Sequence, residues 1–387
     1  MINFNKLTYQ IKRKLSNFSS KITKNISKPK TKFVYQMLYG LLDSQSVLLS
    51  EIARSLNEKI TLKKTIERLS RNSESFEDEK ELKNNYINTV KPIIDEDTIF
   101  CSDRSDIVKK HSEKLEKLDR VRDGSTGKIE DGYETFEIAA LTQKYKMPVS
   151  VYSHVYSSLE KGFKSQNIET LKGLDYVEKC FGNMGIYALD RWYDNNRFYK
   201  YFTEDNNEKN FVIRAQKNRD VIYKGKTMNI LKVANLYKGK YAYYYKDKHG
   251  KQKKAKFSYA SIKLPALPDK ELTLVIIRGD RKEPMMLISN LNPESKKLTL
   301  TILKAYLKRW RIEEYFRFKK QQFNIENIRV QTLKRIRIID LMLTVLIGFI
   351  AMISEKRNKT KLNLWIKKIA KRIYEVPEFD YYKIVDG

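Results

Sequence analysis

The sequence predicts a mixed α/β protein with a small helical domain, an open-sheet core and a β-rich insertion within that core. Helical periodicity appears three times near the N-terminus, over residues 33–42, 47–56 and 62–71. Short apolar runs then alternate with helical segments between residues 98 and 215. Since a domain typically holds ~150 residues, a chain of 387 residues is expected to form two or three domains.

The elements expected in the core follow a definite order. Strands are predicted over residues 98–102, 134–142, 148–156, 186–189 and 211–215, and helices over 168–181 and 196–202. A hairpin-like gap separates the second strand from the third. A ribonuclease-H-like α/β domain has this same order: a strand, two hairpin strands, a helix, a strand, a helix and a strand.

The net charge of +30 calls for a polyanionic partner or for a reason to tolerate self-repulsion. Nucleic acid is the first candidate, because lysines that neutralise phosphates release counterions and gain affinity without reading sequence. Residues 1–42 carry nine Lys or Arg and no acid. The N-terminal helices therefore suggest a DNA-binding unit of the helix-turn-helix kind, although any small helical bundle would show the same pattern, and a lysine-rich composition also favours solubility.

Composition also limits the cofactor and the compartment. The two cysteines, Cys101 and Cys180, form no CxxC pair, and no two of the three histidines have zinc-ligand spacing. A metal site would then use carboxylates, which favour Mg²⁺ or Mn²⁺. No signal peptide is visible, and the apolar run over residues 341–353 is too short to span a bilayer, so we expect a cytoplasmic protein without a membrane partner.

These patterns divide the chain into five expected segments. They are a basic helical DNA-binding domain (1–90), the first part of the core (91–217), a β-rich insertion (218–296), the last part of the core with a basic helix and an apolar closing helix (297–355), and a basic C-terminal tail (356–387).

Two aspartates mark the candidate active site. Asp103 and Asp190 each follow a short apolar strand, and the ligand crevice of an open α/β sheet lies at the carboxyl ends of its strands. Two such aspartates and one glutamate suit a two-metal phosphoryl-transfer site. Asp106 is a rival to Asp103, and strand-end aspartates are also common turn formers.

The segment from Tyr306 to Lys320 contributes the third carboxylate. In a continuous helix with ~100° per residue, Tyr306, Arg309, Glu313 and Lys320 share ~60° of arc, and Arg317 lies on the same face. A separate stripe of Ile312, Phe316 and Phe323 could dock the helix on a sheet. The face suits a phosphate substrate beside a divalent ion, but an ordinary solvated charged face would look alike.

The spacing Tyr-x2-Arg-x3-Glu-x6-Lys at Tyr306, Arg309, Glu313 and Lys320 resembles the YREK signature of DDE transposases from bacterial insertion sequences. Asp190-Arg191 with Asp194 resembles the second-aspartate motif of that family, and residues 118–127 resemble the stretch after its first aspartate. The resemblance covers about residues 95–350.

The resemblance implies a DNA transposase that depends on Mg²⁺ and acts as a homodimer on transposon ends and target DNA. Asp103, Asp190 and Glu313 would bind the metals, and Tyr306, Arg309 and Lys320 would contact phosphates, with Arg191 and Arg317 as further DNA-binding cations. In a bacterium, such an enzyme would be cytoplasmic and associated with the nucleoid when bound. The alternatives are a catalytically silent DNA-binding relative and a nuclease that does not join strands.

The chain departs from one feature of the family. Some members stack a flipped base on a tryptophan of the insertion during hairpin resolution, but Trp192, Trp310 and Trp365 all lie outside residues 218–295. The tyrosines of the insertion could substitute, could be ordinary strand residues, or the hairpin step could differ. The candidates are Tyr237, Tyr241, Tyr243, Tyr244 and Tyr245.

Overall fold

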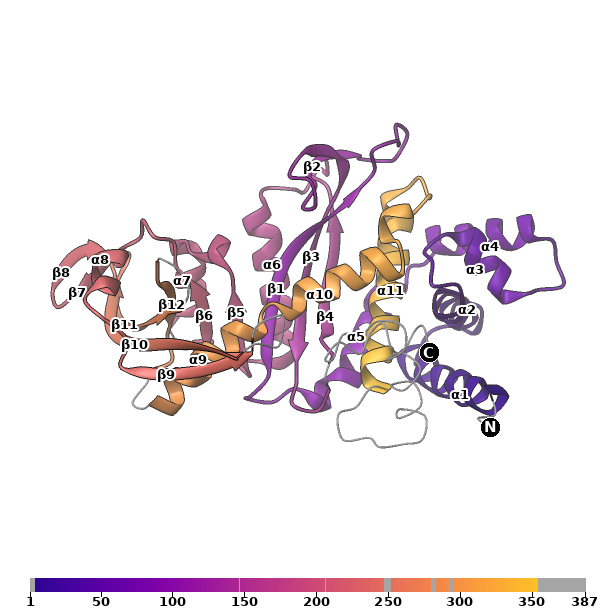
Figure 1. Ribbon diagram of the computed structural model, residues 1–387. Helices are drawn as coiled ribbons and strands as arrows, with labels where there is room; N and C mark the ends of the chain where they lie inside the picture. Colours follow the sequence, from indigo (N-terminus) through magenta and orange to yellow (C-terminus); the bar gives the residue numbers. More distant parts are fainter. Residues whose placement is uncertain are drawn as a thin grey trace. The chain divides into compact units, whose positions relative to one another are not determined.

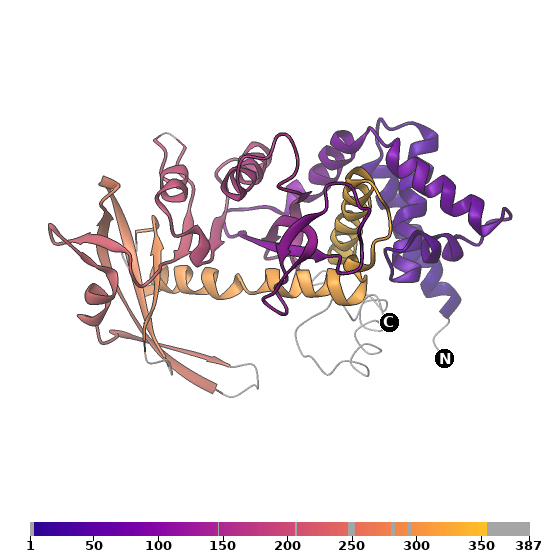
Figure 2. The ribbon, with the colours of Figure 1, turned by 90° about the horizontal axis from the view of Figure 1, so that it is seen from above.

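A computed structural model describes residues 4–145, 147–205, 207–246, 252–279, 283–292 and 296–353 (Figures 1 and 2). The expected basic tail over residues 356–387 lies outside the described residues. The chain divides into two compact units. Unit 1 comprises Met1–Ile94, Asp103–Gly182 and Arg311–Gly387, and unit 2 comprises Asp95–Ser102 and Asn183–Trp310.

Unit 1 begins with five helices: α1 (Phe4–Ile22), α2 (Lys28–Ser44), α3 (Leu49–Leu56), α4 (Leu62–Glu74) and α5 (Glu79–Val90). The three expected helices are confirmed as α2, α3 and α4. Helices α1 and α5 were not predicted, and both are regular helices. Their sequences are dominated by polar residues, but tertiary packing stabilises them: the Phe18 ring of α1 lies 5.2 Å from that of Phe349.

The apolar closing helix α11 (Leu333–Ile353) forms the centre of this helical group (Figure 1). It packs against α2 and α4 and is buried over most of its length. By length and composition alone α11 could cross a membrane, but 83% of its most apolar window is buried within the protein. An all-round apolar helix of this kind is expected in a protein core.

The sheet of unit 1 is sandwiched between two helices. It contains β2 (Asp119–Arg122), β3 (Ile129–Leu141), β4 (Val149–Tyr156) and the second part of β1 (Ile99–Val108). Successive strand residues face opposite sides: Tyr152 of β4 packs on Tyr176 of α6 (Gln166–Phe181), whereas Ser153 donates a hydrogen bond to Asp340 of α11. Helices α6 and α11 thus cover opposite faces of β4.

Unit 2 contains the parallel part of the sheet and the insertion. The first part of β1 pairs in parallel with β5 (Ile186–Leu189), and β5 pairs in parallel with β6 (Phe211–Arg214), with α7 (Asn196–Phe202) between them in sequence. The insertion supplies β7 (Asp220–Tyr223), β8 (Lys226–Asn229), α8 (Ile230–Asn235), β9 (Tyr241–Lys246), β10 (Gln252–Leu264), β11 (Leu267–Arg278) and β12 (Met285–Ser289). Because β12 pairs antiparallel with β6, the insertion extends the sheet.

The strand order confirms the expected fold class. Strands β4, β3, β1, β5 and β6 are neighbours in that order, α6 connects β4 to β5, and β1 belongs to both units. Along the chain the elements follow the order β1, β3, β4, α6, β5, α7 and β6, which is the order predicted from the sequence for a ribonuclease-H-like core.

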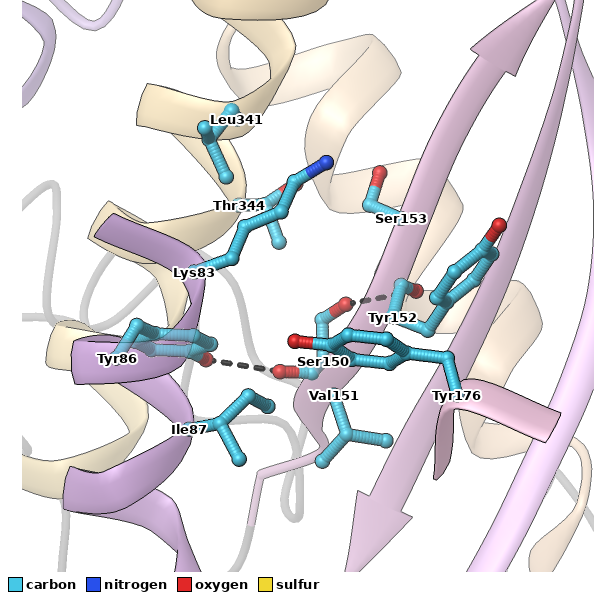
Figure 3. Close-up of a pocket in the computed structure, with 10 residues that line it drawn as sticks. All are labelled: Lys83, Tyr86, Ile87, Ser150, Val151, Tyr152, Ser153, Tyr176, Leu341 and Thr344. Atoms are coloured by element: carbon cyan, nitrogen blue, oxygen red, sulfur yellow. Dashed lines mark hydrogen bonds between the residues drawn. The ribbon is translucent and has the colours of Figure 1, made fainter. Parts of the chain in front are cut away.

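The packing of α11 against α5 can be tested at one glycine of α11. A Cβ at Gly348 would lie 2.1 Å from the hydroxyl of Tyr86 on α5, which donates a 2.9 Å hydrogen bond to the carbonyl of Ser150 (Figure 3). We expect Gly348→Ala to lower the free energy of unfolding by about 1–3 kcal/mol, because the buried tyrosine must move. Urea denaturation would measure this. The control is Gly162→Ala, where a Cβ meets nothing within 4 Å; equal midpoints in both variants would contradict the packing argument.

Candidate active site

The first two candidate carboxylates occupy equivalent positions on two neighbouring strands. β1 and β5 pair in parallel, with Cys101 opposite Ala188. Asp103 and Asp190 each come two residues after that pair. Both aspartates thus lie just beyond the paired residues of β1 and β5.

The expectation that the first strand ends at Asp103 was wrong. Strand β1 continues to Val108, because its second part pairs with the long strand β3 in unit 1. Asp103 is therefore a strand residue, and it accepts a 2.9 Å hydrogen bond from the amide of Arg104. Since a regular strand directs side chains three residues apart to opposite faces, we expect Asp103 and Asp106 to lie on opposite faces of the sheet.

Asp106 is already occupied by protein partners. Its carboxylate lies 2.7 Å from Nζ of Lys320 and accepts a 3.2 Å hydrogen bond from the amide of Gly124. Burial by itself lowers the pKa of Lys320, but the bond to Asp106 raises it above its usual value. Lys320 also pairs with Glu326 at 3.0 Å. Lys320, one of the sequence-predicted DNA contacts, is thus joined to two carboxylates.

The loop that holds Gly124 is fixed by Asp123. The Asp123 carboxylate accepts hydrogen bonds from the hydroxyls and amides of Ser125 and Thr126, and these bonds, the Ser125 hydroxyl first, hold its pKa well below the usual range. The loop belongs to residues 118–127, the segment singled out in the sequence.

Asp190 follows β5 directly and caps the N-terminus of a short 3₁₀ helix, Arg191–Tyr193. Its Oδ1 accepts a 2.9 Å hydrogen bond from the amide of Trp192, while the Arg191 side chain is exposed. The nearby Asp194 has a structural role: it is buried, is paired with Arg219, and accepts hydrogen bonds from Tyr199 and from the amide of Gln216. Burial raises the pKa of Asp194.

The expectation of one continuous helix from Tyr306 to Lys320 was wrong. Helix α9 (Lys296–Lys308) ends in a turn, α10 (Arg311–Arg317) follows, and residues Phe318–Gln322 form a π-helical segment. The uniform ~100° step that placed four side chains on one arc therefore does not hold along this segment. The expected apolar stripe is confirmed, since Ile312, Phe316 and Phe323 are buried.

The predicted site residues of this segment differ in exposure. Glu313 and Arg317 are exposed on α10, Arg309 is half-buried, and Tyr306 is only 8% exposed. An exposed carboxylate beside an exposed guanidinium can meet a metal and a phosphate.

Carboxylate oxygens are the donors that Mg²⁺ and Mn²⁺ prefer, so the donor set of Asp103, Asp190 and Glu313 fits a divalent ion of this kind. Within the described part of the chain, no three His, Cys, Asp or Glu side chains are gathered closely enough to hold a metal. The cavity drawn in Figure 3, of about 100 Å³, is a separate feature, since none of these three residues lines it.

Two exposed basic surfaces can contact nucleic acid. On α4, the side chains of Lys63, Lys64 and Arg71 are exposed, whereas Thr65 and Leu69 are buried. This exposed face follows α3 after a short turn.

The second basic surface is one side of the β9–β10 ribbon, which extends beyond its neighbouring strands in Figure 2. Tyr244 lies opposite Lys254, and Lys254 Nζ is 5.7 Å from the centre of the tyrosine ring. Tyr244 is 57% exposed, while Phe257 on the other side of the ribbon is buried. Among the candidate tyrosines, Tyr241 packs on Phe257 and the Tyr237 hydroxyl lies 3.0 Å from that of Tyr223.

Sequence reasoning missed Lys319, which is 3% exposed and pairs with Glu137 and Asp340. A signal was present: Glu137 and Asp340 are single acids within the apolar runs of a predicted strand and a predicted helix, and a buried acid needs a partner.

Comparison with known proteins gives one family match. The family model described as "Transposase DDE domain" matches residues 164–349, which include Asp190 and Glu313 but not Asp103. No curated protein matches the sequence. A solved piggyBac transposase synaptic complex with hairpin DNA aligns with a TM-score of 0.47 and 10% identity, over 97% of this chain and 81% of that chain. The family match over residues 164–349 supports a DDE transposase, a class of enzyme that cleaves and transfers DNA strands.

Proposed function

We propose that this protein cleaves the ends of a bacterial insertion sequence and joins the resulting 3′-hydroxyls to target DNA. The observation that carries the proposal is the parallel register of β1 and β5, in which Asp103 and Asp190 follow the Cys101–Ala188 pair by the same number of residues. Carboxylates just beyond the paired residues of two neighbouring parallel strands can converge on one cation. The transposase family match over residues 164–349 adds independent support.

In this proposal Asp103, Asp190 and Glu313 bind Mg²⁺ or Mn²⁺. When bound, two such ions would activate the attacking hydroxyl and stabilise the leaving oxygen of the phosphodiester. Arg191 and Arg317, both exposed, would hold phosphates of the cleaved end, and Arg309 and Tyr306 would assist them. For Lys320 to contact a phosphate, the phosphate would have to compete with Asp106.

The proposed partners are transposon-end duplex DNA and target DNA. The exposed cations of α4 and of the β9–β10 ribbon support double-stranded and distorted DNA as ligands. We infer a homodimer, in which each subunit acts on one end, working at the nucleoid in the bacterial cytoplasm; the resemblance in sequence supports this part.

The first test removes the carboxylate of α10. We expect Glu313→Gln to abolish cleavage of labelled end DNA in Mg²⁺, with at least ~10²-fold loss, while the dissociation constant for DNA stays within about two-fold, because the amide keeps the shape but loses the anionic ligand. Gel analysis of cleaved and joined products would measure it. Wild-type cleavage in the variant would remove Glu313 from the site, and cleavage without joined products in the parent protein would favour a nuclease.

The second test separates two aspartates of β1. We expect Asp103→Asn to abolish cleavage and Asp106→Asn to reduce it only in part, because Asp106 is engaged by Lys320 and Gly124. Replacing each aspartate by Cys and supplying Mn²⁺ gives a direct check, since the softer ion tolerates thiolate better. Mn²⁺ rescue at position 106 and not at position 103 would reverse the assignment.

The third test concerns α4. Removing the N-terminal helices would uncover α11, so substitution is the better approach. We expect the combined variant Lys63→Gln, Lys64→Gln and Arg71→Gln to weaken binding of end DNA and to reduce the slope of log K against log salt by up to about 3, since each lost phosphate contact removes about 0.9. Fluorescence anisotropy at several salt concentrations measures both.

The matched control for α4 removes three exposed charges elsewhere in unit 1, by Lys161→Gln, Lys164→Gln and Lys172→Gln. An equal loss of affinity in the two triple variants would show that net charge, and not α4, determines binding.

A further inference from the structure

A charged cluster is buried in unit 1 directly after the helix that carries Glu313. Lys319 Nζ donates to the carboxylate of Glu137 on β3 and lies 2.6 Å from Asp340 of α11. Glu137, Lys319 and Asp340 are 0%, 3% and 3% exposed. The cluster therefore ties three elements of unit 1 together in its core: β3, α11 and the π-helical segment.

Hydroxyl groups complete the cluster. Ser150 donates to Glu137 at 2.9 Å, Ser153 donates to Asp340 at 2.7 Å and to Glu137 at 3.2 Å, and Lys319 reaches the Thr344 hydroxyl at 3.2 Å. Ser150, Ser153 and Thr344 also line the cavity of Figure 3. Burial by itself lowers the pKa of Lys319, but Asp340 and Glu137 raise it above its usual value, so the ammonium remains charged. A charged, hydrogen-bonded ammonium between two carboxylates fixes position and direction in a way that apolar contact does not.

Helix α10 needs such a directional constraint. It has only seven residues, and its buried side chains, Ile312, Tyr315 and Phe316, contribute non-directional packing. Lys319 lies in the π-helical segment two residues beyond its end, and Lys319 Nζ also lies 5.6 Å from the ring centre of Tyr315. A π-helical turn is rare and often occurs at functional sites, where it alters the direction of the following side chains.

We propose that Lys319, held by Glu137 and Asp340, is a positioning residue that fixes the rotation of α10 and thereby the direction in which Glu313 meets the metal. This inference rests on the proposed function, in which Glu313 is a metal ligand. Lys319 is buried, so in this proposal it acts only through Glu313. Lys320, whose side chain is 24% exposed, belongs by contrast to the more accessible ion pair with Asp106.

The test measures the dissociation constant for Mn²⁺ by titration calorimetry on the full chain, beside the Mg²⁺ concentration that gives half-maximal DNA cleavage. In Lys319→Met we expect both values to rise at least ten-fold, with DNA affinity unchanged, because α10 is no longer held. The matched control is Arg337→Met, which removes a 2.7 Å bond from α11 to the carbonyl of Val155 on β4 and a 2.7 Å pair with Glu160. The control should lose stability with both metal values unchanged.

A merely structural role for Lys319 would lower the melting temperature in both variants and leave both metal values at those of the parent protein, which would overturn the proposal. If Lys319→Met does not fold, the neutral combination Lys319→Met, Glu137→Gln and Asp340→Asn leaves no unpaired buried charge and should fold. The same ten-fold rise is expected there, and parent-like metal values would overturn the proposal.

The two proposals fail separately. If the parent protein binds Mn²⁺ and Lys319→Met weakens that binding, but no DNA is cleaved, then transposase activity is refuted and the positioning role stands. If DNA is cleaved and the Mn²⁺ affinities of the parent and Lys319→Met agree, the positioning role alone is refuted.

Discussion

Strand β1 is the constraint on which the rest of the structure depends. Its first residues pair in parallel with β5, and its later residues lie beside β3, so one strand belongs to both compact units. The candidate ligand Asp103 and the occupied Asp106 both lie on it, three residues apart. A shift of one residue in either ladder would exchange the faces on which these side chains lie. The hydrogen-bonded register of β1 therefore determines on which face of the strand each of these two acids lies.

The interior of unit 1 is unusual in containing charge where apolar packing would suffice. Replacing a buried ion cluster by apolar residues of similar volume is often neutral or stabilising, so stability alone does not account for Glu137, Lys319 and Asp340. What such a cluster provides is a unique arrangement, since its hydrogen bonds are satisfied in one geometry only. That property would matter most beside the short helix α10, whose exposed acid Glu313 is the proposed metal ligand.

Much of this fold could be predicted from local pattern. Residues 186–189 and 196–202 are bounded by clear polarity changes, and β5 and α7 occupy the same residues. The end of β1 could not be predicted, because the polar run after Ser102 resembles a turn until β3 is present beside it. The break between α9 and α10 carries no Gly or Pro signal, so helical periodicity continues through it. Lys319 and Lys320 are adjacent in sequence, and only tertiary contacts distinguish the buried one from the half-buried one.

The chain order of unit 1 has a consequence for biosynthesis. Its helices α1 to α5 are made first, yet α11, on which they pack, is among the last described segments to be translated. In the sequence, all residues of unit 2 come between α5 and α11, so unit 2 is synthesised completely before α11. Until α11 has been made, the apolar surface that the N-terminal helices pack against it stays exposed. This surface includes the side of α1 that carries Phe18. Unit 1 can therefore complete its packing only once α11 has been made, and until then its N-terminal helices are exposed to aggregation and to chaperones.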